Sequence, residues 1–120
     1  MSKPTAQILL ERYWDEASNA GNVELIRELC ADPIIRHDPE KRTELSHEEQ
    51  IERVRFGIEK MGVQISRVVI HADETMATSV WNLTSTQDEN MKLCGIEVFK
   101  VENGRLAECW NTPYAQGHWG

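Results

Sequence analysis

The sequence predicts an α+β fold in which three N-terminal helices pack on one face of a curved, mainly antiparallel sheet. Apolar residues recur at helical spacing in the first half of the chain, and from residue 63 onward they alternate with polar residues. The segment Glu102-Asn-Gly-Arg105 adds a hairpin, because Asn-Gly is typical of the tight turn between two antiparallel strands. Helices followed by meandering strands are typical of an α+β arrangement, which we expect to form a single domain over residues 1–120.

The three helices are indicated by apolar stripes together with start and stop signals. The first is predicted over residues 5–20, where Leu10, Trp14 and other apolar side chains share one face. A second, shorter helix follows Asn22 and ends at Asp32-Pro33, because the residue before a proline leaves the α region. The third begins at the capping box Ser46-His-Glu-Glu49.

The second half of the chain is rich in Val, Ile, Thr and aromatic residues, which favour strands. Four strands are predicted, over residues 63–72, 75–86, 91–101 and 105–112. They are long and the helices are few, so the sheet is expected to curl around the helices. A curled sheet with a helix across its mouth leaves a conical cavity that can hold a small ligand.

The composition argues against nucleic acid or a membrane as a partner. The formal net charge is −7 and the acidic and basic residues are interspersed, whereas both partners need a concentrated basic surface. No apolar run approaches the length of a membrane span, and no apolar leader segment is seen. We therefore expect a cytoplasmic protein, with Cys30, Cys94 and Cys109 as buried, reduced thiols.

No cofactor or metal is expected. The four histidines lack the i, i+4 or His-x-x-(x)-Glu spacing that builds a metal site on one element. The glycines are scattered and form no phosphate-binding loop, and there is no Gly-x-Ser-x-Gly elbow for a serine nucleophile. Any reaction is therefore expected to proceed by acid–base chemistry of the side chains.

The order of the predicted elements and the run Gly95-Ile-Glu-Val-Phe-Lys-Val-Glu-Asn-Gly-Arg-Leu-Ala-Glu-Cys-Trp-Asn111 resemble one known family. It is the SnoaL-like, polyketide-cyclase-like branch of the nuclear transport factor 2-like (NTF2-like) superfamily. The resemblance implies the cone-shaped NTF2-like, or cystatin-like, fold. It also implies a pocket for a small, largely apolar molecule and a homodimer formed through the outer face of the sheet. Because the fold hosts isomerases, cyclases, dehydratases, epoxide hydrolases and binding domains, it does not identify one activity.

Glu97 is the first candidate for acid–base chemistry. Its position in the predicted strand places it on the same face as Leu93 and Phe99, which is expected to look into the cone. A carboxyl group among apolar neighbours either finds a partner or has its pKa raised by desolvation, as a general acid or base requires. The alternatives are a bulge that turns Glu97 outward and a structural ion pair.

His37 and Asn111 are the other catalytic candidates. The resembled family often has a histidine in the segment Arg36-His-Asp-Pro39, near the pocket. There the imidazole would serve as a base oriented by Asp38 or Glu97. The alternative is that His37 bonds a loop carbonyl. The resembled cyclases carry an acid where Asn111 stands, and asparagine transfers no proton, so Asn111 is expected to polarise a substrate oxygen.

Side chains from several elements are expected to line the substrate pocket, with simple core packing as the alternative: Tyr13, Trp14, Phe56, Trp81, Leu93, Phe99, Cys109 and Tyr114. The predicted function is a cofactor-independent isomerase, cyclase or lyase acting on a compact, apolar, carbonyl-bearing substrate. The alternatives are a non-catalytic small-ligand-binding protein and a dimeric interaction module whose cone is filled by its own side chains. An epoxide hydrolase would need an Asp–Arg–Asp set, and no two aspartates can be placed beside Arg36 or Arg67.

Overall fold

One sheet forms the frame of the structure, a computed structural model that describes residues 2–120. Its strands are β1 (Cys30–Asp38), β2 (Lys41–Leu45), β3 (Val63–Ala72), β4 (Met76–Ser85), β5 (Lys92–Glu102), β6 (Arg105–Asn111) and β7 (Ala115–Gln116). The strand order is β2-β1-β6-β5-β4-β3, and the short β7 pairs with β5. All pairings are antiparallel except that of β1 with β6, which confirms the predicted α+β class and the mainly antiparallel sheet.

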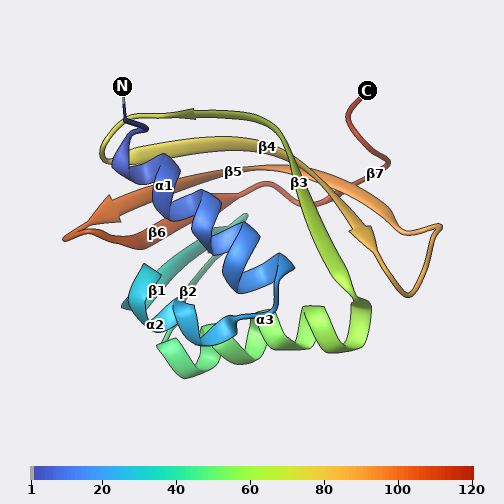
Figure 1. Cartoon of the computed structure of the whole chain (residues 1–120), viewed down its shortest axis with the longest axis horizontal. Helices are drawn as coiled ribbons and strands as arrows, with labels where there is room; N and C mark the ends of the chain where they lie inside the picture. Colours follow the sequence, from blue (N-terminus) through green and yellow to red (C-terminus); the bar gives the residue numbers. More distant parts are fainter. Residues whose placement is uncertain (1) are drawn as a thin grey trace.

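The helices lie together on the concave side of this sheet (Figure 1). They are α1 (Thr5–Arg12), the π-helix η1 (Tyr13–Asn19), the 3-10 turn η2 (Val23–Leu25), α2 (Ile26–Leu29) and α3 (His47–Met61). The predicted first helix is thus α1 continued by a π-helix. π-Helical turns are rare among protein helices, and those that occur are often found at functional sites.

Helix α3 has the predicted ends. Ser46 Oγ accepts a hydrogen bond from Glu49 N, and Glu49 Oε1 accepts one from Ser46 N, which completes the capping box. The helix ends at Gly62, whose φ of 61° lies in the left-handed region that glycine adopts without cost. A helix fixed at both ends is a firm support for the side chains that it presents to the sheet.

The hairpin between β5 and β6 also forms as predicted. Asn103 and Gly104 have φ values of 51° and 74°, and Glu102 pairs with Arg105 across the turn. The register shifts between Lys100 and Val101, on the hairpin side of Glu97. This irregularity therefore leaves Glu97 on the concave face.

The segment before α3 differs from the prediction. The second helix is only a 3-10 turn and one turn of α-helix, and β1 begins at Cys30, which pairs with Leu106 of β6. Strand β2 was not predicted, because Lys-Arg-Thr-Glu-Leu has little hydrophobic alternation. It is an edge strand, paired only with β1, where charged residues are tolerated.

The core fills the space between the concave face and the helices. Trp14, Leu10, Ile26 and Trp81 are among its fully buried side chains. The three cysteines are free and buried, as predicted: Cys30, Cys94 and Cys109.

Glycine is required where Trp81 crosses β5. A Cβ added at Gly95 would lie 2.5 Å from Trp81 Cζ2, far closer than two carbon atoms can approach. Trp81 and Gly95 are directly paired across β4 and β5, so the missing side chain makes room for the indole ring.

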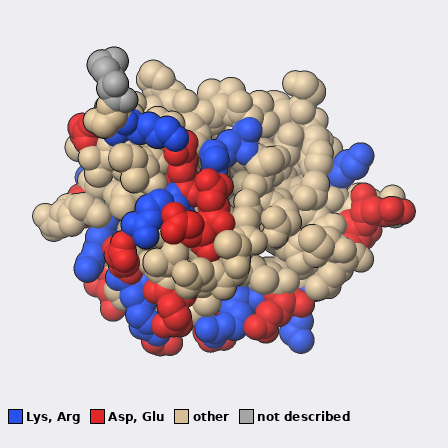
Figure 2. All heavy atoms as spheres, in the orientation of Figure 1, with Lys and Arg blue, Asp and Glu red and all other residues tan. Residues whose placement is uncertain are grey.

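Figure 2 shows acidic and basic side chains next to one another over the helical part of this face rather than in separate blocks. No helix within residues 2–120 is long and apolar enough to cross a membrane. The same residues contain no group of three His, Cys, Asp or Glu side chains placed to hold a metal ion.

Candidate functional site

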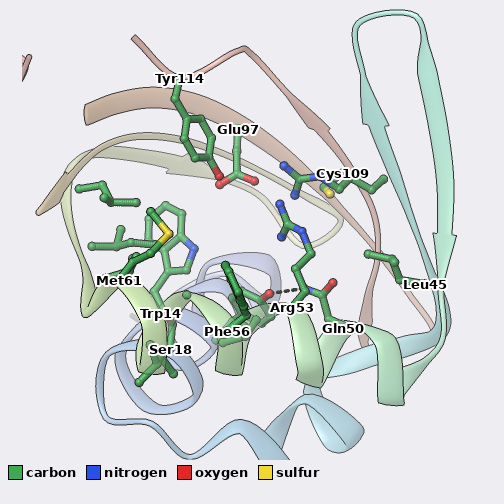
Figure 3. Close-up of a pocket in the computed structure, with 18 of the residues that line it drawn as sticks. Trp14, Ser18, Leu45, Gln50, Arg53, Phe56, Met61, Glu97, Cys109 and Tyr114 are labelled. Carbon is green, nitrogen blue, oxygen red and sulfur yellow. Dashed lines mark hydrogen bonds between the residues drawn. The ribbon is translucent and has the colours of Figure 1, made fainter. Parts of the chain in front are cut away.

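A cavity of about 320 Å³ lies between the concave face of the sheet, η1 and α3 (Figure 3). This volume is at the small end of the range found for ligand pockets. The sheet contributes residues from β1 to β5: Ile34, Arg36, Leu45, Val63, Ile65, Leu83, Leu93, Glu97 and Phe99. The helices, β6 and the C-terminal segment complete the lining: Tyr13, Trp14, Ser18, Gln50, Arg53, Val54, Phe56, Gly57, Ile58, Met61, Cys109 and Tyr114.

Helix α3 forms one wall of the cavity with a stripe of residues spaced three and four apart. The stripe begins with Gln50 and Arg53 and ends with Ile58 and Met61. Its polar members thus come from the first half of the helix and its apolar members from the second half. Gln50 is buried and its amide donates a hydrogen bond to the hydroxyl of Tyr13, which joins α3 to η1 across the wall.

The sheet has the same division from one side to the other. Arg36 lies on β1, at one side of the sheet, whereas Leu83 and Ile65 lie on β4 and β3, at the other side. Glu97 on β5 lies between them. The cavity therefore has a polar end near β1 and an apolar end near β3, which suits a ligand with one polar group on an apolar body.

Glu97 is the carboxyl group of the cavity, with a residue exposure of 7%. Burial raises the pKa of Glu97 to about 7, although the charges of Arg36 and Arg53 act to lower it. The carboxyl thus titrates near neutral pH. Such a group changes its protonation state easily, which is what proton transfer to and from a substrate requires.

Glu97 belongs to a row of buried polar side chains that crosses the sheet. It pairs directly with Ser79 on β4 and with Asn111 on β6. Within residues 2–120, Ser79 Oγ, Asn111 Oδ1 and the indole nitrogen of Trp81 have no hydrogen-bond partner. The Trp81 indole lies near enough to favour the charged form of Glu97 but without hydrogen-bond geometry. Unsatisfied buried polar atoms are rare in folded proteins, and here they flank the titrating carboxyl group.

Two side chains at the mouth of the cavity are directed at this carboxyl group. Figure 3 shows the Arg53 guanidinium group and the Tyr114 hydroxyl group pointing toward Glu97. Tyr114 has an exposure of 45%, and its ring packs edge-on against Trp81 with 4.9 Å between the ring centroids. Phe56, also at the mouth, has an exposure of 59%. The mouth therefore opens to solvent beside the polar end.

The structure does not bring His37 to the cavity. Because side chains alternate along a strand, Ile34 and Arg36 of β1 line the cavity and His37 points to the convex face. There its ring stacks on Trp110 with 5.0 Å between the centroids, and its Nε2 is hydrogen-bonded to Glu108. The prediction that placed His37 at the pocket was therefore wrong.

Asn111 and Trp81 lie beneath the cavity rather than in its lining. Asn111 is buried, and its amide donates long hydrogen bonds to the His37 carbonyl oxygen (3.5 Å) and to Cys109 Sγ (3.6 Å). Trp81 packs over the backbone of Gly95. The structure places the other predicted pocket residues in the lining: Tyr13, Trp14, Phe56, Leu93, Phe99, Cys109 and Tyr114.

Arg36, Arg53 and Gln50 are lining residues that the sequence analysis did not select. The alternation that excludes His37 points to Arg36, the adjacent residue on β1. Arg53 and Gln50 continue the helical stripe that contains Val54 and Ile58, so their spacing was a signal for both.

Comparison with known proteins agrees with the architecture described above. The sequence matches the family described as a SnoaL-like domain over residues 10–109. A proposed polyketide cyclase from Acidithiobacillus ferrooxidans has a similar structure, with 23% identity, a TM-score of 0.77, and coverage of 92% of this chain and 89% of that one. No curated protein sequence matches the chain.

Two further structures with the same fold have other activities in their descriptions. A proposed ketosteroid isomerase from Kribbella flavida shares 19% identity with a TM-score of 0.75, over 97% of this chain and 82% of that one. A LEH-like epoxide hydrolase from M. tuberculosis shares 14% identity with a TM-score of 0.73, over 92% and 83%. At these identities the similarity shows the NTF2-like fold alone, because this fold hosts unrelated reactions.

Proposed function

Because the chain belongs to the SnoaL-like domain family, we propose that it is a cofactor-independent acid–base enzyme acting on a compact, apolar, carbonyl-bearing molecule. The observation that carries this proposal is the Glu97 carboxyl group, which lies in the cavity and has a pKa of about 7. A group with this pKa is populated in both protonation states at neutral pH, so it can take up and return a proton in one catalytic cycle.

The proposed step is removal of a proton from the carbon next to the substrate carbonyl. The C–H bond breaks, its electron pair forms the enolate, and the proton passes to a carboxylate oxygen of Glu97. Tyr114 points toward Glu97, and its hydroxyl group would donate a hydrogen bond to the negative enolate oxygen. This is the role that the sequence predicted for Asn111, which does not line the cavity.

The fate of the enolate defines the reaction class. Return of the proton from Glu97 to a different carbon is an isomerisation. Attack of the enolate carbon on a second carbonyl of the same substrate, with the proton passing from Glu97 to the alkoxide oxygen so formed, is a cyclisation. Glu97 is the only carboxyl group in the described lining of the main cavity, so one group would both remove and return the proton. The catalytic set therefore favours a reaction with a single mobile proton.

Hydrogen exchange in D₂O tests this step without knowledge of the natural substrate. Cyclohexanone, acetophenone and benzylacetone would be incubated with the protein, and deuterium at the α-carbon would be measured by NMR. Exchange faster than in buffer is expected for the wild type and for Arg55→Gln, which alters an α3 residue outside the cavity lining. Glu97→Gln should return the rate to that of buffer, and undiminished exchange in this variant would contradict the assignment.

A non-catalytic binding protein is the second candidate. It is favoured by Asn111, which stands where the resembled cyclases carry an acid. In this case the ketones would bind in the cavity, as shown by NMR shifts of its lining residues, without exchange at the α-carbon. The open cavity argues against the third possibility, an interaction module with a closed interior.

A homodimer through the convex face is also part of this proposal. Trp110 is exposed there, and Ile35, Ile96 and Val98 on neighbouring strands are half-buried in the single chain. A charged side chain in this surface would disfavour its burial against a second subunit. Trp110→Asp should therefore convert a dimer into a monomer in native mass spectrometry. A wild type that is monomeric at micromolar concentration would contradict this assembly.

A further inference from the structure

A second hollow, of about 420 Å³, adjoins the polar end of the main cavity. The two share four lining residues: Arg36, Leu45, Arg53 and Tyr114. The second hollow adds residues of β1, β2 and the segment after β6: Asp38, Lys41, Thr43, Thr112 and Pro113. A ligand in the main cavity can therefore extend into it past Arg36 and Arg53.

The second hollow is basic in a protein that is otherwise acidic. Arg36, Lys41 and Arg53 line it, against Asp38 as its one acidic lining residue in the described chain. The whole sequence has 13 basic and 20 acidic residues. An excess of basic over acidic side chains around one hollow is therefore the opposite of the balance in the chain as a whole. We name Arg36, Lys41 and Arg53 the cation cluster.

Two members of the cluster have no ion-pair partner within residues 2–120, although acidic residues are abundant. Neither Arg53 nor Lys41 forms a salt bridge or a side-chain hydrogen bond there. Arg55, two residues along the same helix, is paired with Glu52 and lies 3.9 Å from Glu24. The guanidinium group of Arg53 is thus available to a ligand, whereas that of Arg55 is occupied.

The third member is held in place by Asp38. Arg36 Nε donates a hydrogen bond to Asp38 Oδ2 over 3.1 Å, which leaves its two terminal nitrogens without a protein acceptor in the described chain. The Arg36 side chain has an exposure of 13%, so solvent screens its charge only weakly. A buried, oriented guanidinium group with free donors is suited to an oxyanion, which it can bind through two parallel hydrogen bonds.

From this geometry we infer that the cation cluster binds an anionic oxygen group of the ligand, while the apolar part of the ligand occupies the main cavity. The ligand is therefore a compact amphipathic anion, an apolar body that carries a carboxylate or a phosphate. The inference names a substrate class for the proposed enzyme and rests on that function only in using the same cavity. The anion would also fix which carbon of the body faces Glu97.

Matched probes with one aromatic body test the inference. Phenylacetate, phenyl phosphate and the neutral phenylacetamide would be titrated at low ionic strength into isotope-labelled protein, and the dissociation constants read from NMR shifts. Each anion is expected to bind about tenfold or more tightly than the amide, since a hydrogen bond to a charged group is stronger than one between neutral groups. The tighter of the two anions identifies a carboxylate or a phosphate as the natural group.

Arg53→Gln and Arg55→Gln form the matched pair of variants. Arg53 is exposed and Arg55 is half-buried, so neither change should prevent folding. Arg53→Gln is expected to reduce the preference for anions over the amide by about tenfold. Arg55→Gln should leave the preference intact. Equal binding of amide and anions to the wild type, no binding of either anion, or an unchanged preference in Arg53→Gln would each overturn the inference.

The same titrations on Glu97→Gln separate this inference from the proposed reaction. If Glu97→Gln loses α-carbon exchange but keeps the preference for anions, both stand. If the wild type exchanges neutral ketones but binds the amide as well as the anions, the reaction stands and the anion site is overturned. If anions are preferred and exchange does not depend on Glu97, the site stands and the proposed reaction is overturned.

Discussion

The two faces of the sheet place the same kinds of side chain in different environments. On the convex face, Glu108 is partly exposed and is hydrogen-bonded to His37, whose ring stacks on Trp110. On the concave face, Glu97 is buried and forms no ion pair within 4.0 Å in residues 2–120. The two glutamates lie on neighbouring strands, a few residues apart along the pairing, with their side chains on opposite faces.

This difference teaches that the environment, rather than the residue type, selects the candidate acid. A carboxylate paired at a partly exposed position is a structural group of modest energy. A carboxyl group that is desolvated, with guanidinium groups nearby but not bonded to it, keeps its proton up to neutral pH. The predictions below test whether chemistry is confined to the concave face.

The largest expected effect separates Glu97 from His37 in α-carbon exchange. Glu97→Gln removes the group that accepts the proton, and such losses cost about 10²- to 10⁴-fold in rate. His37→Ala changes a side chain on the other face and should keep the wild-type rate. Exchange followed by NMR in D₂O measures both, with circular dichroism as the control for folding. A large loss in His37→Ala would break the comparison.

The second effect is a dependence of stability on pH that originates on the concave face. The pKa of Glu97 is about 7 in the folded protein against 4.5 as the ordinary value, so the folded state binds the proton more tightly. The associated stability is fully present below pH 4.5 and is lost as the pH rises through 7. For this shift the loss is about 3 kcal/mol.

Urea denaturation at several pH values measures this loss. The wild type should fall in free energy of unfolding, relative to Glu97→Gln, between pH 4.5 and 7 and change little above that range. The charged groups that act on Glu97 are Arg36, Arg53 and Asp38. Parallel pH profiles for the two proteins would show that Glu97 is not desolvated.

The third prediction concerns the packing beneath Glu97. Gly95→Ala places a carbon 2.5 Å from Trp81, which is itself fully buried, and should lower the free energy of unfolding by about 1–3 kcal/mol. Gly57→Ala on α3 is the matched control, because its added carbon would lie 3.7 Å from Val63. Thermal or urea unfolding measures both changes. Equal stabilities of the two variants would show that Trp81 can move aside.

Most of the fold could be predicted from the sequence because its signals are local. The capping box before α3 and the Asn-Gly turn between β5 and β6 depend on a few adjacent residues, and both form as expected. Strand β2 depends on its partner β1, since its own residues are mostly polar. The π-helix at residues 13–19 likewise could not be predicted, because its apolar residues have the same spacing as those of an ordinary α-helix.

The site residues could be predicted only on strands whose alternation of inward and outward side chains can be read from the sequence. Glu97 lies in a long alternating strand whose bulge comes after it, so its direction followed from the sequence. His37 lies in a short extended segment between two prolines. The pattern of apolar and polar residues there does not indicate which side chains face the sheet's concave side. Arg53 was missed for a different reason, because a polar residue on a helix is normally solvated and the hollow beside it is a tertiary feature.

The smallest expected effect lies on the convex face, in the contact of His37 with Glu108. Both side chains are partly exposed, so their ion pair contributes at most about 1 kcal/mol, and only while His37 is protonated. A double-mutant cycle of His37→Ala and Glu108→Ala, built from free energies of unfolding, would give the coupling energy. A small coupling, with α-carbon exchange unchanged in all three variants, is expected of a structural pair. A loss of exchange in Glu108→Ala alone would instead extend the chemistry across the sheet, because this carboxyl group has no access to the cavity except through β1 and β6.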